Sequence, residues 1–245
     1  MFKYFISIIF LFVFVDGFSQ EQKTEIKETK TDSIIYKSNY GLRLGIDISK
    51  PVLSKIDATY SGFEIVGDYR ISKRFYVAAE VGFEEETSDE DYTNSTSKGN
   101  YIRLGINYNA YENWLDMNNE IFVGFRYGFS LFDQTLNSYT PNVTTDPDNV
   151  INPANGNYFP ANSINTPIST SSLNAHWSEF ILGLKAETSK NVFVGVSISY
   201  KVLLSATEPE NFKTLYAPGF NRIFETSTGF GFNYTISYLI PFKKK

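Results

Sequence analysis

The chain has 245 residues, no cysteine and a formal net charge of −5. This length suits one domain, or one domain with a tail. The absence of thiols excludes a disulfide framework and a thiolate metal site, and the acidic balance excludes broad nucleic-acid binding, which needs a basic surface.

Residues 1–19 are typical of an export signal. Lys3 supplies a positive start, residues 4–15 are almost entirely apolar, and Gly17 and Ser19 are the small residues expected before a cleavage site. The apolar run is too short to span a bilayer. We therefore predict a cleaved signal peptide over 1–19, with an uncleaved anchor as the alternative.

Residues 20–39 are rich in Glu, Lys, Thr and Ser and predict a flexible periplasmic leader, because such a composition cannot bury a core. No later apolar run reaches the length of a transmembrane helix. A mature chain located in a membrane would therefore have to cross it as a closed β-barrel.

From Tyr40 onward the sequence alternates between apolar and polar residues. In the first segment Leu42 and Leu44 share one face, and Arg43 and Asp47 share the other. Each segment is about ten residues long, the length that a tilted strand needs to cross a bilayer. The eight segments cover residues 42–49, 63–71, 75–84, 102–109, 120–131, 179–187, 194–202 and 230–238.

Alternation alone also fits a soluble sandwich or a lipocalin-like barrel. Three features favour a membrane barrel: glycines recur on the polar face, aromatic residues gather towards the ends of the apolar face, and charges of both signs lie in mid-strand on the polar face. We predict that these charges point into a closed lumen and pair there. They are Arg43, Asp47, Glu64, Asp68, Arg70, Glu80, Arg103, Arg126 and Lys185.

Short and long connections alternate along the chain, as they do in outer-membrane barrels. Short ones lie at residues 72–74, at 189–191 and around Trp114, and the long ones are expected to be external loops. The sequence thus predicts an all-β fold, a closed antiparallel eight-stranded transmembrane β-barrel over residues 40–242, with ten strands if the longest loop hides a hairpin. The long connections cover residues 51–60, 85–100, 132–175 and 205–225.

The ending Tyr234-Thr-Ile-Ser-Tyr-Leu-Ile-Pro-Phe242, together with the signal ending Phe18-Ser19-Gln20, resembles uncharacterised outer-membrane β-barrel proteins of the Bacteroidota, a family of unknown function. The resemblance covers essentially the whole mature chain. It implies location in the cell outer membrane and insertion by the barrel-assembly machinery, and it brings no established activity. The chain departs from the usual terminal pattern because three lysines follow Phe242.

The single histidine, His176, lies two residues before Ser178, so both side chains share the outward face of a strand. This pair resembles the site of lipid A deacylases, in which a serine attacks an ester and a histidine is its base. Glu208 is the nearest candidate for the orienting acid. We favour the alternative, an interfacial His and Ser beside a girdle Trp, because three-residue patterns often match by accident.

A run of acids in the second long connection offers Glu85, Glu86, Asp89 and Asp91 as oxygen ligands for Ca²⁺. A solvated, self-repelling loop is the favoured interpretation, since no EF-hand spacing is present. The sequence predicts no cofactor.

The leading functional hypothesis is a non-enzymatic structural or surface-interaction protein that displays external loops next to outer-membrane lipid and lipopolysaccharide. A narrow pore or carrier for a small solute is the second hypothesis, and a lipid A deacylase-like hydrolase is the third. The sequence does not identify an external ligand.

Overall fold

The computed structural model describes residues 39–111, 118–140, 163–209 and 212–244, all within one compact unit. The predicted signal peptide and all but the last residue of the predicted leader lie outside these residues. The described chain is all-β apart from one short helix.

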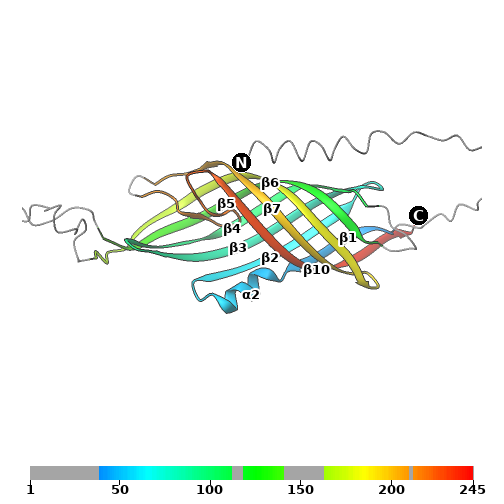
Figure 1. Ribbon diagram of the computed structural model, residues 1–245, viewed down its shortest axis with the longest axis horizontal. Helices are drawn as coiled ribbons and strands as arrows, with labels where there is room; N and C mark the ends of the chain where they lie inside the picture. Colours follow the sequence, from blue (N-terminus) through cyan, green and yellow to red (C-terminus); the bar gives the residue numbers. More distant parts are fainter. Residues whose placement is uncertain (1–38, 112–117, 141–162, 210–211, 245) are drawn as a thin grey trace, which may run out of the picture. The chain divides into compact units, whose positions relative to one another are not determined.

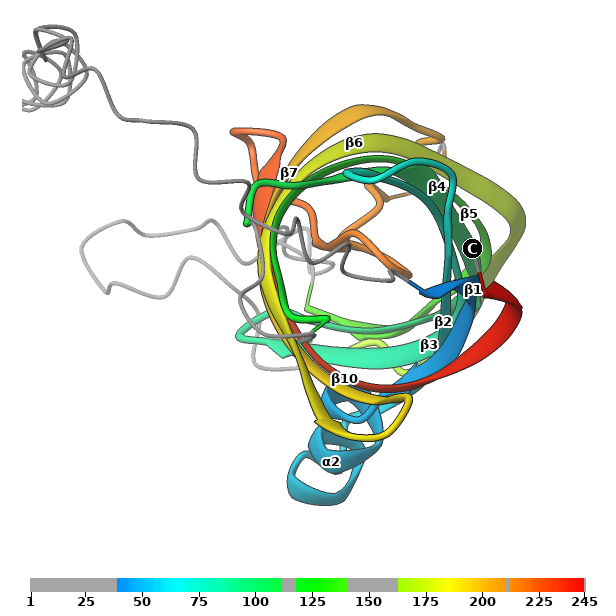
Figure 2. The ribbon, with the colours of Figure 1, turned by 90° about the vertical axis from the view of Figure 1, so that its right-hand side faces the viewer.

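Eight long antiparallel strands form a sheet whose hydrogen bonds close into a ring, in the order β1-β10-β7-β6-β5-β4-β3-β2 (Figures 1 and 2). Every neighbouring pair is antiparallel, and β1 closes the ring against β10. The strands are β1 (Asn39–Asp47), β2 (Tyr60–Arg70), β3 (Phe75–Glu90), β4 (Thr93–Asn109), β5 (Glu120–Tyr139), β6 (Ile168–Ser189), β7 (Val192–Ala206) and β10 (Thr228–Lys244). The predicted strand number and antiparallel pairing are confirmed.

The alternating sequence places most large apolar side chains outside the ring and the charged ones inside it, together with some aromatic residues such as Tyr101 and Trp177. On β4, for example, Leu104 is 50% exposed on the outer face while the adjacent Arg103 is 3% exposed inside. Large exposed apolar side chains occur on all eight strands of the ring. This arrangement reverses that of most folded domains, in which charged residues are almost never fully buried unless they are paired.

Glycines on the inner face make room for bulky neighbours. The backbone of Gly128 lies directly against the indole of Trp177, and Gly82 lies against the ring of Tyr101. A Cβ atom at either glycine would overlap the aromatic ring. The recurring inward glycines are therefore needed to fit large side chains into a narrow interior.

Replacing Gly128 with alanine should lower the free energy of unfolding by about 1–3 kcal/mol, the usual cost of overpacking. Trp177 is fully buried and cannot move aside freely. Gly67→Ala is the matched control, because a Cβ atom there would meet mainly the flexible side chain of Leu44, 3.2 Å away on the outer face. Equal stability of both variants in denaturant unfolding would contradict the tight packing at Gly128.

All four predicted long loops have structure that the sequence pattern did not show. In the longest, 132–175, β5 continues to Tyr139 and β6 begins at Ile168, and residues 141–162, where a further hairpin would give ten strands, lie outside the described residues. Strands β3 and β4 continue far beyond their apolar segments, so most of the predicted loop 85–100 is a hairpin with its turn at residues 91–92. Residues 51–60 contain most of helix α2 (Ser49–Ile56), and 205–225 contain a small hairpin of β8 (Tyr216–Ala217) and β9 (Asn221–Arg222). Within the described residues, no helix combines the length and apolar character required to cross a membrane.

Candidate functional site

The centre of the ring is occupied by a buried ion-pair network around Arg103. Its guanidinium lies 2.6 Å from Glu64, 2.8 Å from Glu80 and 3.2 Å from Glu179, measured between nitrogen and carboxylate oxygen. Arg126 lies 3.2 Å from the second oxygen of Glu80. These side chains come from five different strands and meet because each occupies an inward position of the alternation.

A second group lies nearer the end of the ring that holds the short turns. Arg43 is 2.6 Å from Asp68 and makes two contacts with Glu120, at 2.7 and 3.0 Å. Lys185 pairs with the other oxygen of Asp68. Charged groups this deeply buried are tolerated only when they are paired and hydrogen-bonded, and these satisfy both conditions.

Two of the predicted network residues have different partners. Asp47 is fully buried but accepts a hydrogen bond of 2.5 Å from the neutral amide of Asn233. Arg70 donates to the carbonyl oxygens of Ser72 and Lys73 in the β2–β3 turn. Both residues lie at the ends of their strands. Their side chains therefore reach a neighbouring strand or the turn backbone and not the charges at the centre of the ring.

Little space remains between these side chains. A cavity of about 40 Å³ lies beside Arg103, Arg126 and Lys185. Since one water molecule needs roughly 10–15 Å³ of such space, the cavity has room for only a few water molecules. The interior of the ring is filled with side chains at this level.

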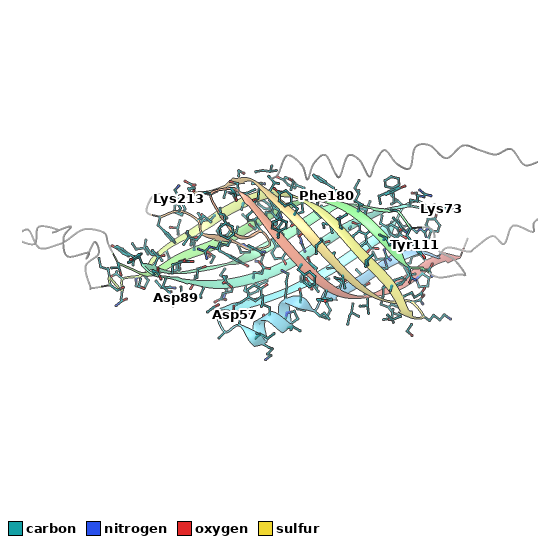
Figure 3. The ribbon with its side chains drawn as sticks, viewed as in Figure 1. Asp57, Lys73, Asp89, Tyr111, Phe180 and Lys213 are labelled. Atoms are coloured by element: carbon teal, nitrogen blue, oxygen red, sulfur yellow. The ribbon has the colours of Figure 1, made fainter. Side chains whose placement is uncertain are left out.

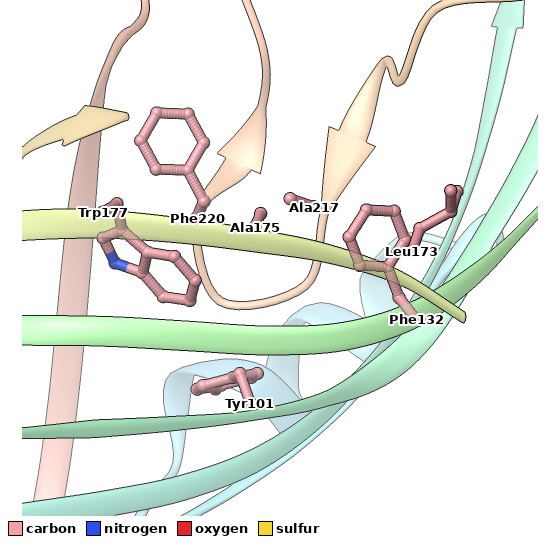
Figure 4. Packing of buried hydrophobic residues seen from close by; sticks show 7 residues of the cluster. All are labelled: Tyr101, Phe132, Leu173, Ala175, Trp177, Ala217 and Phe220. Atoms are coloured by element: carbon pink, nitrogen blue, oxygen red, sulfur yellow. The ribbon is translucent and has the colours of Figure 1, made fainter. Parts of the chain in front are cut away.

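The β8–β9 hairpin lies at the end of the ring that carries the long connections. Figure 4 shows its Ala217 and Phe220 packed with Ala175 and Trp177 of β6. At its tip Gly219 adopts a φ of 81°, a conformation that favours glycine. Its N–H donates to Glu84 at 2.6 Å, and its carbonyl accepts from Lys201 at 2.6 Å. The next residue, Phe220, is fully buried against Trp177.

Glu84 holds several segments together at this end. It accepts hydrogen bonds from Tyr60 at 3.0 Å and Tyr216 at 2.8 Å, and it pairs with Lys50 of helix α2. A strand, a helix and the β8–β9 hairpin thus converge on one fully buried carboxylate. We call residues 216–222, held by Glu84, Lys201 and Trp177, the cap.

An open cleft of about 700 Å³ lies beside the cap, lined by Lys50 and Leu53 of α2, Tyr60, Glu86 and Phe232 among others. Figure 3 shows Asp57 and Asp89 at this end of the ring and Lys73 and Tyr111 at the other.

The proposed Ca²⁺ ligands were wrongly assigned to a loop. Glu85, Glu86 and Asp89 belong to β3, which continues as strand because its Thr and Ser residues pair with those of β4. Asp91 is exposed in the turn. Strand alternation sends Glu85 outward, where it pairs with Lys98, and Glu86 towards the cleft. Among the described residues, no group of three or more His, Cys, Asp or Glu side chains is arranged to hold a metal ion.

Partial burial, with the negative charges of Asp57 and Glu84, raises the pKa of Glu86 to about 7. A raised carboxyl pKa means that the folded state holds the proton more tightly than the unfolded state does. The contribution of Glu86 to stability is therefore greatest at low pH and is lost as the pH rises towards 7. A ¹³C carboxyl titration should find this midpoint, and Asp57→Asn should lower it. A midpoint that Asp57→Asn leaves unchanged would contradict the coupling between the two carboxylates.

The structure places His176 and Ser178 on the outer face of β6. His176 Nδ1 is hydrogen-bonded to the hydroxyl of Tyr127 at 2.6 Å and its ring packs on Phe129. Among the described residues, no hydrogen bond joins His176 to Ser178 or to Glu208. Glu208 is exposed. This geometry gives no support to a hydrolytic triad.

Trp177 was wrongly interpreted as a girdle residue. It is fully buried inside the ring, and its Nε1 donates to Glu179 at 2.6 Å. The strand alternation already pointed to this, because Trp177 and Glu179 lie on the same face.

Several residues of the network and of the cap were not predicted from the sequence. The alternation of side chains along each strand could have identified Glu120, Glu179 and Lys201, because all three occupy inward positions. Lys50 and Tyr216 come from connections, and no periodic signal marks them.

Fold and site together define an all-β protein with a closed ring of eight antiparallel strands, an interior of paired charges and a capped mouth. The chain belongs to the family described as "Domain of unknown function (DUF6048)", whose model matches residues 1–245. A search of curated proteins finds no match to the chain.

Proposed function

We propose that this chain is a β-barrel of the cell outer membrane that has a structural or surface-interaction role and no enzymatic activity. The observation that carries this proposal is the apolar outer surface, to which all eight strands contribute large exposed side chains. Soluble monomers rarely expose apolar patches larger than a few hundred Å². Lipid would cover this surface, and the closed ring leaves no strand edge to be satisfied within a bilayer.

The interacting part of the protein is the end with the long connections. It carries the cap, the cleft and the projecting β3–β4 hairpin, and in this proposal it faces the exterior, next to lipopolysaccharide. The barrel-assembly machinery would insert the chain after export. The filled interior favours display of this end over transport of a solute.

Location is tested by cell fractionation and N-terminal sequencing. We expect a mature chain that begins at Gln20 in the outer-membrane fraction. Recovery of folded chain from the soluble periplasm would refute the proposal.

Contact with lipid is tested by placing arginine on the outer face. Leu104→Arg should lower the free energy of unfolding from bilayers by roughly 2–4 kcal/mol, the cost of a cation near the membrane midplane. Asn100→Arg lies on the same exposed face of β4, beyond the apolar residues, and should have much less effect, because the cost of arginine falls towards the membrane boundary. An equal loss for both variants, or a loss that does not change with bilayer thickness, would argue that this face packs against protein.

Conductance separates display from transport. We expect the purified chain to open no channels in planar bilayers, because ion pairs and the cap fill the interior. Steady single-channel currents from the unaltered protein would favour the narrow pore.

A further inference from the structure

Helix α2 has an apolar side that is largely exposed in the described part of the chain. Val52, Leu53 and Ile56 are 52%, 44% and 78% exposed, and no residue of the helix is buried. Several exposed apolar side chains on one side of a short surface helix call for an explanation, because contiguous exposed apolar patches mark interaction sites.

The opposite side of α2 is fixed to the ring. Lys50 pairs with the buried Glu84, and Ser54 accepts a hydrogen bond of 2.9 Å from the backbone N–H of Gly62. Residues in a helix follow one another at 3.6 per turn, so Val52 and Ile56 lie nearly opposite to Lys50 and Ser54. The two inward anchors therefore set which way the apolar side points, away from the interior of the ring.

The helix lies outside the circle of strands, beside β2 and β10 (Figure 2). The outer faces of these strands carry Phe63 on β2 and Phe232 and Tyr234 on β10, which are 46%, 51% and 42% exposed. Leu53 and Phe232 line the same cleft. The apolar side of α2 thus continues the apolar outer surface of the ring.

We infer that α2 is an interfacial membrane helix whose Val52 and Ile56 insert into the lipid at the outer boundary of the bilayer. Helices with this arrangement lie in the membrane plane with the apolar side about 5–10 Å into the boundary between head groups and acyl chains. The exposed Lys55 lies on the flank, where an ammonium group can reach anionic head groups. This inference rests on the proposed membrane location and adds a second lipid contact to that of the strands.

The chain has no cysteine, so single introduced cysteines can be spin-labelled without first removing a native one. Labels at Ile56→Cys, at Leu104→Cys in the ring wall and at Asp91→Cys in the β3–β4 turn would be compared in vesicles of phosphatidylcholine and phosphatidylglycerol. Collisions with oxygen report lipid exposure, and collisions with a water-soluble nickel chelate report water exposure. We expect the oxygen-to-chelate ratio at position 56 to be several-fold higher than at position 91 and close to that at position 104.

The controls separate two kinds of failure. If the label at 104 lies in lipid while that at 56 matches 91, the inference about α2 is wrong and the proposed location stands. If position 56 is shielded from both reagents, a protein segment covers the helix and the inference is also wrong. If position 104 is as accessible to the chelate as position 91, the membrane location itself fails. Val52→Cys repeats the measurement should Ile56→Cys not fold.

Discussion

Replacing Arg103 with methionine should lower the free energy of unfolding by about 3–5 kcal/mol, the usual cost of removing one partner from a buried ion pair. The change would leave Glu64, Glu80 and Glu179 facing one another without their shared cation. Denaturant unfolding in detergent or lipid measures the loss.

Lys98→Met is the matched control. Lys98 also pairs with a carboxylate, Glu85, but the two side chains are 60% and 38% exposed. An exposed pair contributes about 0–1 kcal/mol, so this variant should unfold almost normally. Losses of the same size for both variants would show that the interior of the ring is open to water.

Replacing Glu84 with alanine should release the cap. Lys50 would lose its partner, and both Tyr216 and the Gly219 N–H would lose their acceptor. The substitution should weaken the docking of the cap by about 3–5 kcal/mol, the usual cost of breaking a buried ion pair. Since 1.4 kcal/mol corresponds to a tenfold change in an equilibrium constant, the open form of the cap should become at least on the order of 100-fold more populated. Chymotrypsin cleavage after the buried Phe220 should accelerate accordingly.

Glu90→Ala controls for a general effect of removing an acid at this end. Glu90 pairs with Arg222 of the cap at 2.7 Å, but both side chains are largely exposed. Cleavage after Phe220 should therefore change little in this variant. Equal cleavage of the Glu84→Ala and unaltered proteins would mean that the cap is held by its apolar contacts with Trp177 and not by the buried carboxylate.

The direction of each strand side chain, inward or outward, was the feature of the structure that the sequence predicted best. Because side chains alternate strictly along a strand, the apolar row through Leu104 fixed the inward position of Arg103 without any knowledge of its partners. The sequence could not show which inward charges meet, since that depends on the register between strands. Asp47 and Arg70 were assigned to the network for this reason, although they bond to Asn233 and to turn carbonyls.

The connections were less predictable, for three physical reasons. Strands β3 and β4 continue through Thr, Ser and Asn residues, so the apolar period that marks a strand is absent there. Helix α2 has no buried side and is held mainly by Lys50 and Ser54, which leaves no amphipathic pattern facing a core. The cap depends on contacts between residues as distant as 84 and 219, and no local signal encodes such a pairing.

The pairing of the first strand with the last has a consequence for how the molecule assembles. Asp47 is a partner of Thr235, so β1 cannot complete its hydrogen bonds until almost the entire chain is present. Contacts of such large sequence separation make folding slow, because the loss of chain entropy precedes the gain in bonding. A nascent or truncated chain that lacks β10 would present β1 and β7 as two open edges, each able to pair with another molecule. Closure of the ring therefore has to wait for β10, and an incomplete chain is expected to aggregate or be degraded before it can reach a partly functional form.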